Sequence, residues 1–436
     1  MKLFSLNVFL EKKESWIISI IIIGFSGLDL PFLVIRGLRI FSYIMICLLA
    51  FKKRRQILHL VYKDKVILAL HLLAFISVTW TVAPYITSTR FIALIRTTLA
   101  GVILATYTPN QQRKLLINIT LICGLLSILA ITFLPTYGIN QSNSSWEGIF
   151  LFKNYLSLMM IIGVTYWLSS LLFSSSNKIQ NFILIVVGII LIIFSESGTF
   201  IASLAASTSL IPLYVIVKQN YKVRPVYFAF TILLSVMIAL VVMHNISFLV
   251  QDFLGKDLTL TGRDTLWKAI ISQGLKRPLS GYGFAAFWYS DASLEAIAEN
   301  GWPDLPPLGE YLEFHSHSGF VEIFVQLGFP GLVLMVISFT MALLNSFRYL
   351  NLVGSIEGLW MLQLVVIMII ANYTEVPSFV SANNFQWILY VSITLSMSNQ
   401  LEIIRIIRTK NSSLNTSTLK SKSANPYLLR DISTQR

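Results

Sequence analysis

Long apolar segments alternate with short polar connections through most of this chain. A segment crosses the hydrocarbon core of a bilayer as a helix when it holds about 20 apolar residues, with a range of about 17–25. The pattern therefore predicts an all-α polytopic membrane protein with about twelve transmembrane helices, of which the second and seventh are short for a full crossing. The predicted spans are 16–34, 37–51, 66–83, 91–107, 115–135, 155–174, 181–194, 199–217, 225–249, 319–345, 357–373 and 379–399.

A long polar segment, residues 251–318, interrupts this pattern. Nine predicted helices precede it within residues 1–250, and three follow within residues 319–399. Residues 400–436 form a basic tail rich in Ser, Thr, Asn and Lys, which we expect to be disordered. A long loop between spans is a frequent location for the chemistry of a membrane enzyme. We therefore look for the functional site in residues 251–318.

Composition indicates an integral membrane protein. Hydrophobic residues make up 55% of the chain and charged residues 12%, whereas a soluble protein carries roughly a quarter charged residues. The formal charge of +13 reflects membrane topology, because Lys and Arg collect in cytoplasmic loops, and we expect no nucleic-acid partner. Cys47 and Cys123 both fall in predicted spans and indicate no disulfide framework.

The basic residues occupy alternate connections between the predicted spans. With a cytoplasmic N-terminus, the opposite connections at 136–150, 195–198 and 374–378 contain no Lys or Arg. We therefore expect both termini in the cytoplasm and the loop 251–318 outside it. The exceptions on the outer side are Arg36, Arg39 and Arg90.

An amphipathic helix is predicted inside the loop. Thr261 and Asp264 resemble a capping box, and Pro278 ends the helix. Its apolar face would hold Leu266, Trp267, Ile270 and Ile271. Near its N-terminus, the free backbone N–H groups and the guanidinium of Arg263 would suit an oxyanion such as a phosphate. An arginine that faces solvent or a lipid headgroup is an equal alternative.

Two histidines, His315 and His317, close the loop just before the tenth span. A metal site with Glu313, a solvated pair of loop histidines, and a general base near Glu322 are alternatives that sequence leaves open. Two histidines at this spacing share a face in an extended segment. We expect no bound metal and no other cofactor.

Cations also occur in or beside the spans. Arg96 lies within the fourth predicted span and Arg90 flanks it, while Lys153 and Asn154 precede the sixth. An arginine in the membrane is costly and usually faces a water-filled or ligand-filled cavity, although Arg90 and Lys153 could each snorkel to a headgroup. Topology places these cations toward the outer side, and their convergence there implies an anionic ligand.

Three sequence blocks resemble the O-antigen ligase and Wzy-type polysaccharide polymerase superfamily, and most of all its exopolysaccharide polymerase branch. The blocks are Gly148-Ile149-Phe150-Leu151-Phe152-Lys153-Asn154; Leu260-Thr261-Gly262-Arg263 with Trp267, Pro278, Gly281-Tyr282-Gly283 and Phe287-Trp288; and His315-x-His317-Ser318-Gly319 with Glu322 and Gly328-Phe329-Pro330-Gly331. The arrangement of spans around one large outer loop is also similar to this family.

The resemblance implies a lipid-dependent, GT-C-like glycosyltransferase in the bacterial inner membrane, with its large loop in the periplasm. The activity implied is metal-independent, inverting glycosyl transfer from an undecaprenyl-diphosphate-linked glycan. The first hypothesis is a polymerase that joins lipid-linked repeat units into exopolysaccharide or O-antigen. The second is an O-antigen ligase that moves the glycan to lipid A core or another acceptor. Implied partners are the donor, a glycan or lipid-linked acceptor, membrane lipids and polysaccharide export machinery.

A transporter of a small anion or lipid-linked glycan is the alternative from a different class. A transporter predicts paired broken helices in two repeated halves, which the sequence does not show.

The resemblance also implies roles for individual residues. His317 matches the essential histidine of the family, and Arg263 would bind the donor diphosphate; both are candidate catalytic residues. We expect Arg90, Arg96 and Lys153 to join Arg263 in binding the diphosphate. Supporting residues would be Asn154, His315 and Glu322.

The chain departs from the family pattern at three places. Phe152 stands where the family often has His, and Ser318 where it usually has Asn. The Ser-rich turn after the seventh span, Ser195 to Thr199, lacks the common basic residue. These departures concern the details of the donor site.

Overall fold

The computed structural model describes residues 14–174, 177–219, 263–299, 315–374 and 379–423, with isolated positions between 226 and 241. Across these residues the secondary structure is helical, apart from two isolated β-bridges, Leu28 with Phe150 and Ile139 with Trp146. The all-α prediction is confirmed for the described part of the chain.

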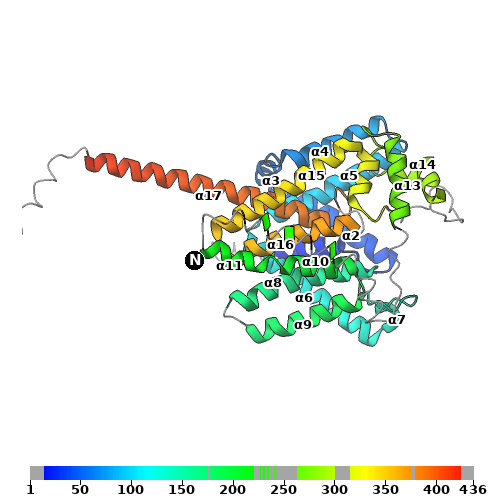
Figure 1. Cartoon of the computed structure of the whole chain (residues 1–436), viewed down its shortest axis with the longest axis horizontal. Coiled ribbons are helices and arrows are strands. Elements are labelled where there is room, and N and C mark those ends of the chain that lie inside the picture. The colour runs from blue at the N-terminus through cyan, green and yellow to red at the C-terminus, as the bar shows by residue number, and fades with distance from the viewer. Residues whose placement is uncertain are drawn as a thin grey trace, which may run out of the picture.

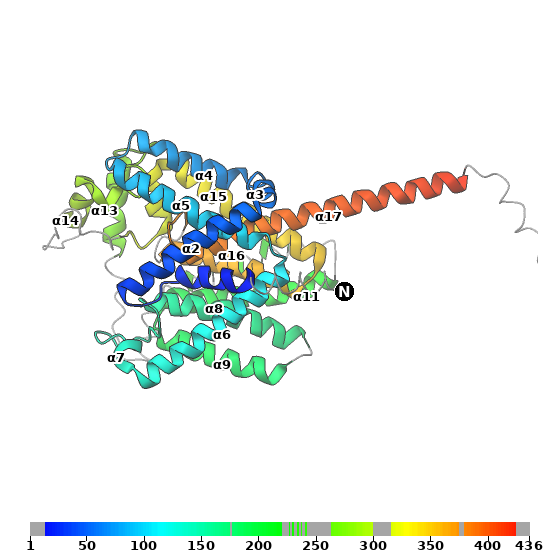
Figure 2. The same cartoon turned by 180° about the vertical axis from the view of Figure 1, so that it is seen from behind.

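The helices run back and forth between two ends of a bundle (Figures 1 and 2). A helix Glu14–Gly24 comes first. It is followed by α2 (Phe32–Lys52), α3 (Arg54–Val61), α4 (Lys65–Ile76), α5 (Pro84–Ala105), α6 (Pro109–Phe133), α7 (Pro135–Gly138), α8 (Lys153–Phe173), α9 (Lys178–Phe194), α10 (Gly198–Thr208), α11 (Ile211–Gln219), α13 (Arg263–Leu275), α14 (Asp291–Glu299), α15 (Gly319–Val353), α16 (Ile356–Thr374) and α17 (Phe385–Ser423). We call the end that carries α7, α13 and α14 the loop end, and the end from which α17 projects the tail end.

The chain is a multi-pass membrane protein. Among the described residues, seven helices are long and apolar enough to span a bilayer. They are Phe32–Lys52, Pro84–Ala105, Pro109–Phe133, Lys153–Phe173, Gly198–Val217, Gly319–Val353 and Ile356–Tyr373. Shorter apolar helices are Glu14–Gly24, Lys65–Thr79 and Lys178–Phe194. Most of the ninth predicted span, 225–249, lies outside the described residues, so the total of about twelve remains a prediction.

The first apolar stretch breaks at a different place from the one predicted. We expected spans 16–34 and 37–51, but the first helix ends at Gly24 and α2 begins at Phe32. Gly27, with φ +78°, lies in the break, and its carbonyl accepts a hydrogen bond from the backbone N–H of Leu151 at 2.9 Å. The break is therefore held by a contact with a segment more than a hundred residues away. Hydropathy is a local property of the sequence and does not predict such a contact.

The last helix is longer than expected. The predicted span was 379–399, followed by a disordered tail over 400–436, whereas α17 runs from Phe385 to Ser423. Its first half packs in the bundle, with Trp387 fully buried, and its second half projects away from the other helices (Figures 1 and 2). Residues 424–436 lie outside the described residues.

Candidate active site

A kink in α15 shapes the loop end. Gly328 adopts φ 66° and ψ −166°, a conformation that only glycine populates readily, and Pro330 follows it inside the helix. The backbone N–H of Phe329, at the kink, donates to the carbonyl of Pro278 in the loop at 2.7 Å. The kink therefore opens α15 so that its backbone can bind the loop.

The loop after α13 makes further backbone hydrogen bonds to α15. We call this contact between residues 278–284 and α15 the joint. The backbone N–H groups of Tyr282 and Gly283 donate to the carbonyls of Val325 and Gln326, each at 2.9 Å. Gly283 has φ +100°, and a Cβ there would lie 2.2 Å from Oγ1 of Thr81. The second and third sequence blocks are thus the two sides of one backbone contact.

The same loop is also bound to the start of α5. The indole Nε1 of Trp80 donates to the carbonyl of Ser280 at 2.9 Å. The hydroxyl of Thr87 donates to the carbonyl of Phe284 at 2.9 Å, and the N–H of Phe284 donates to the hydroxyl of Ser77 at 3.0 Å. These bonds hold the loop against two parts of the bundle, α15 and the α4–α5 connection.

Where the sequence predicted a helix in the loop, the structure has α13. Leu266 and Ile270 are buried, and they pack in one cluster with Val321 and Val325 of α15. Ile271, which we placed on the apolar face, is instead 38% exposed. The buried face is therefore narrower than predicted, and it faces the first turns of α15.

The two histidines lie together at the start of α15. His317 has φ +51°, a left-handed conformation that is uncommon for a residue other than glycine. Its backbone N–H donates to Nδ1 of His315 at 3.2 Å, and the two ring centroids are 4.1 Å apart. The left-handed conformation of His317 therefore brings the two rings to the same side of the backbone, whereas the sequence suggested an extended segment.

Glu322 holds the peptide between the histidines. The residue is 5% exposed, and its carboxylate accepts hydrogen bonds from the backbone N–H of Ser316 at 3.0 Å, from Nε1 of Trp288 at 2.8 Å and from Nε2 of Gln326 at 2.8 Å. From the other side, Nε1 of Trp267 donates to the carbonyl of Ser316 at 2.7 Å. Both groups of the Ser316 backbone are thus bound, which fixes the position of the neighbouring histidines.

Arg263 is the first residue of α13, and its side chain lies outside the described residues. Its backbone position is four residues before Trp267, so it lies one turn away on the same side of the helix. Trp267 donates a hydrogen bond to Ser316 in residues 315–318, which we call the histidine segment. The helix therefore begins one turn from that contact.

Arg96 lies deeper in its helix than predicted. The fourth span was expected to start at residue 91, but α5 begins at Pro84, a residue that suits the first turn of a helix. Arg96 is therefore near the middle of α5, and Arg90 lies inside the helix on the side of the loop end. The guanidinium of Arg96 stacks over the ring of Tyr43 at 4.0 Å, and its Nε is buried without a hydrogen-bond partner among the described residues.

Lys153 and Asn154 form the first turn of α8, at the loop end. Oδ1 of Asn154 accepts a hydrogen bond from the hydroxyl of Ser197 at 2.7 Å. Oγ of Ser157 bonds with Oγ of Ser195 one turn further along α8. The first sequence block thus contacts the Ser-rich turn between α9 and α10, a contact that the sequence analysis did not predict.

Sequence reasoning missed two residues of α2 near these cations. Arg39 interacts electrostatically with Tyr155, which is two residues after Lys153. Tyr43, one turn after Arg39, makes a cation–π contact with the guanidinium of Arg96. We had treated Arg39 only as an exception to the charge pattern. Its place inside the predicted span 37–51 is the same signal that drew attention to Arg96.

No group of three or more His, Cys, Asp or Glu side chains that could hold a metal ion occurs among the described residues. Glu313, the third ligand of the metal alternative, lies outside them. The described candidates therefore fall into two groups: the histidine segment with α13, and the cations of α5 and α8.

Comparison with known proteins supports the resemblance. Residues 182–336 match the family model described as "O-Antigen ligase". A relative named "Exopolysaccharide production protein ExoQ", from Rhizobium meliloti (strain 1021), is 37% identical over 99 residues, which are 23% of this chain and 21% of the relative. A "Putative polysaccharide ligase RP358" from Rickettsia prowazekii (strain Madrid E) is 25% identical over 234 residues, 52% of this chain and 55% of the relative.

A further "Putative polysaccharide ligase", from Rickettsia felis (strain ATCC VR-1525 / URRWXCal2), is 22% identical over 295 residues, 65% of this chain and 67% of the relative. The matches to the first two relatives thus span about a fifth and about half of their lengths. The matched family region contains α13, the histidine segment and the kink in α15. The predicted resemblance is confirmed: residues 182–336 of this chain are similar to the O-antigen ligase family.

Proposed function

We propose that this protein polymerises undecaprenyl-diphosphate-linked oligosaccharide repeat units into exopolysaccharide or O-antigen. The reaction is a metal-independent, inverting glycosyl transfer at the outer face of the bacterial inner membrane, on a GT-C-like fold. The 37% identity to the exopolysaccharide production protein, although confined to 99 residues, favours this activity.

One observation carries the proposal. The indole of Trp267 on α13 binds the carbonyl of Ser316, between the two histidines, at 2.7 Å. Arg263 begins the same helix one turn earlier. His317, the candidate base, and Arg263, the candidate diphosphate-binding cation, are far apart in the sequence. The hydrogen bond from Trp267 to Ser316 joins the two segments that carry them.

The chemistry follows from these two groups. His317, whose side-chain type titrates near neutral pH, accepts the proton of the acceptor hydroxyl. The acceptor oxygen forms a bond to the anomeric carbon while the bond from that carbon to the diphosphate oxygen breaks. The electron pair leaves with the diphosphate, whose charge is held by arginine. Attack opposite the leaving group inverts the anomeric configuration.

The remaining cations complete the donor site in this proposal. Arg90, Arg96 and Lys153 bind the diphosphate together with Arg263. The buried Nε of Arg96, which has no hydrogen-bond partner among the described residues, supports an anionic ligand in this region. Asn154 positions the first turn of α8, and His315 and Glu322 position His317.

A ligase is the second candidate, because the relatives named as polysaccharide ligases match 52% and 65% of the chain. It would use the same donor chemistry and transfer the glycan to lipid A core or to another lipid acceptor. In both cases both termini are cytoplasmic, the loop 251–318 faces the periplasm, and export machinery receives the product.

A defined lipid-diphosphate-linked oligosaccharide, incubated with the purified protein in nanodiscs, tests the proposal. Longer glycans on the same lipid, detected by mass spectrometry, are the expected product. Transfer only to added lipid A core would assign the ligase instead. Transport of unchanged substrate into vesicles, with neither product, would contradict both.

Single substitutions test the two catalytic candidates. We expect His317→Ala to lower turnover about 10²–10⁴-fold, the usual range for loss of a general base. We expect Arg263→Ala to lower it about 10²–10³-fold, through lost stabilisation of the leaving group. Matched controls are His59→Ala on α3, at the tail end, and Lys268→Ala, which removes an exposed cation from α13, and both should retain turnover. Full activity in both test variants would overturn the site.

A further inference from the structure

A polar cavity lies at the tail end of the bundle, at the opposite end from the histidine segment. Its volume is about 550 Å³, within the range of about 300–1,000 Å³ that is typical of ligand pockets. It is lined by Glu14, Lys52, Lys53, Arg54, Arg55, Gln56, Thr106, Tyr107 and Gln111. Four of these residues are cationic and one is a carboxylate.

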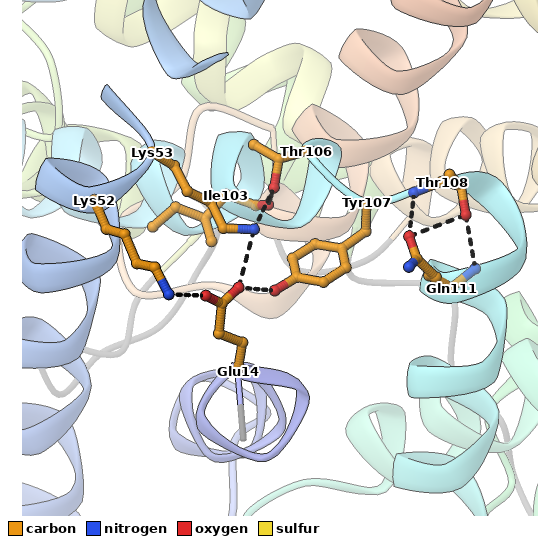
Figure 3. A network of polar contacts seen from close by, with 8 residues as sticks. All are labelled: Glu14, Lys52, Lys53, Ile103, Thr106, Tyr107, Thr108 and Gln111. Atoms are coloured by element: carbon orange, nitrogen blue, oxygen red, sulfur yellow. Dashed lines mark hydrogen bonds and ion pairs between the residues drawn. The ribbon is translucent and has the colours of Figure 1, made fainter. Parts of the chain in front are cut away.

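Glu14 is already bound by its neighbours (Figure 3). One carboxylate oxygen accepts a hydrogen bond from Lys52, and the other accepts from the hydroxyl of Tyr107 at 2.8 Å and pairs with Nζ of Lys53 at 3.2 Å. Burial raises the pKa of Glu14, but the bonds from Lys52 and Tyr107 and the charge of Lys53 outweigh it and lower the pKa to about 2. The carboxylate is therefore ionised at neutral pH, and the contact joins three helix ends.

A positive charge remains after this pairing. Arg54 and Arg55 are exposed at the start of α3, and the side chain of Lys52 is 56% exposed although it contacts Glu14. The first turn of α3 also lines the cavity, and no side chain caps that turn. Free N–H groups at a helix start and adjacent guanidinium groups both favour a phosphate.

The bend between α2 and α3 brings these groups around the cavity. Lys53, with φ −100° and ψ 16°, separates the two helices. Its Nζ lies 4.1 Å from the ring centroid of Tyr107 and 3.2 Å from Oγ1 of Thr106. Cations that only mark membrane topology need no shared concave surface. Here three chain segments build a common surface around them.

We propose that this cavity binds the phosphate group of a phosphate ester. The ester is either a phospholipid headgroup, since the cavity lies at the ends of the spans α2 and α5, or a soluble phosphorylated molecule. Arg54 and Arg55 bind the phosphate oxygens, and Lys52 adds charge. The site is independent of the donor site at the loop end.

Titrations on the full-length protein in neutral detergent test this proposal. One arm measures phosphatidylglycerol binding by native mass spectrometry, with phosphatidylcholine, a zwitterion whose phosphate is paired with a quaternary ammonium, as the comparison of zero net charge. The other arm measures ADP binding by isothermal calorimetry. The double variant Arg54→Gln/Arg55→Gln is compared with Lys178→Gln/Arg348→Gln, which removes the same charge from exposed positions at the tail end outside the cavity.

We expect the cavity variant to weaken binding at least tenfold in one arm, while the control pair changes it less than twofold. Loss in the first arm assigns a lipid headgroup, and loss in the second assigns a soluble ligand. Arg54→Lys/Arg55→Lys, which keeps the charge but not the bidentate geometry, should bind with intermediate affinity. Equal weakening by both Gln pairs, or no specific binding in either arm, would overturn the proposal.

Discussion

At the scale of single residues, the buried carboxylate of Glu322 organises the candidate active site. The sequence placed it near the histidines as a partner of a general base. In the structure it binds the backbone N–H of Ser316 and the side chains of Trp288 and Gln326. Its role is therefore to position the segment that carries His317, through the peptide that precedes that histidine.

Glu322→Gln should separate positioning from simple stability. An amide has one acceptor oxygen, so at least one of the three buried donors would lose its partner, at about 1–3 kcal/mol. We expect a lower melting temperature and a lower kcat, with a smaller change in KM because the donor cations are elsewhere. Activity assays and thermal unfolding of the purified variant provide the check.

The matched control for Glu322 is Glu295→Gln, on α14 at the same end of the bundle. Glu295 pairs with Lys276 at 2.8 Å on the surface, where both side chains are more than half exposed. This variant should keep both activity and melting temperature. If Glu322→Gln behaved in the same way, the positioning role would be wrong.

Residue types were easier to predict than residue geometry. The sequence identified His315, His317 and Glu322 because polar residues at the mouth of a span are unusual. The sequence did not predict the left-handed backbone of His317 or the hydrogen bond from Trp267 to Ser316, because both depend on packing between segments far apart in the chain. Arg39 was missed because its electrostatic interaction with Tyr155 acts between two helices that are far apart in the sequence.

At the scale of elements, the joint between the loop and α15 is the main structural device of the loop end. The segment Gly281-Tyr282-Gly283 lies in a turn, and its glycines also allow the loop backbone to lie against the backbone of α15, next to the kink at Gly328. A local pattern predicts a turn, but it does not identify the distant segment, here α15, whose backbone the turn binds.

Gly328→Ala should weaken this joint. A Cβ at this position would lie 2.6 Å from backbone atoms of Pro278 and Leu279, and the backbone conformation itself is strained for alanine. We expect a loss of about 1–3 kcal/mol from the strain alone, together with reduced activity as the loop separates from α15. Thermal unfolding and the polymerisation assay measure both effects.

Gly37→Ala is the control for this substitution. Gly37 lies within α2, and a Cβ there would meet no atom within 4 Å. Because alanine favours a helix over glycine by about 1 kcal/mol, this variant should be neutral or slightly more stable. A Gly328→Ala protein as stable and active as the Gly37→Ala protein would show that the joint is dispensable.

Helix order was predictable, but several boundaries were not. Hydropathy located each described apolar helix, because burial in lipid requires apolar side chains over most of its length. It began α5 too late, since the first turns from Pro84 to Arg90 are polar yet helical. These turns contact the loop through Thr87, so tertiary hydrogen bonds compensate for their poor hydropathy.

At the scale of the whole molecule, the connections at the tail end are richer in basic residues than those at the loop end, although Arg90, Lys153 and the cations of α13 lie at the loop end. The described ends and connections at the tail end carry Lys52, Lys53, Arg54, Arg55, Lys63, Lys65, Arg113, Lys114, Lys178 and Arg348. At the loop end, the connections 134–152, 195–197 and 379–384 contain no Lys or Arg. The alternation deduced from the sequence thus corresponds to two opposite ends of the folded bundle (Figures 1 and 2).

This excess of basic residues at the tail end predicts the orientation of the protein in the membrane. The tail end should face the cytoplasm and the loop end the periplasm, because positive charge is retained on the cytoplasmic side. Single cysteines in a protein with Cys47 and Cys123 replaced by serine report this. Ser272→Cys, exposed on α13, should react with a membrane-impermeant maleimide in intact spheroplasts, whereas Lys114→Cys, exposed on α6, should react only after permeabilisation. The reverse labelling would place the candidate active site in the cytoplasm, where a donor presented in the outer leaflet could not reach it.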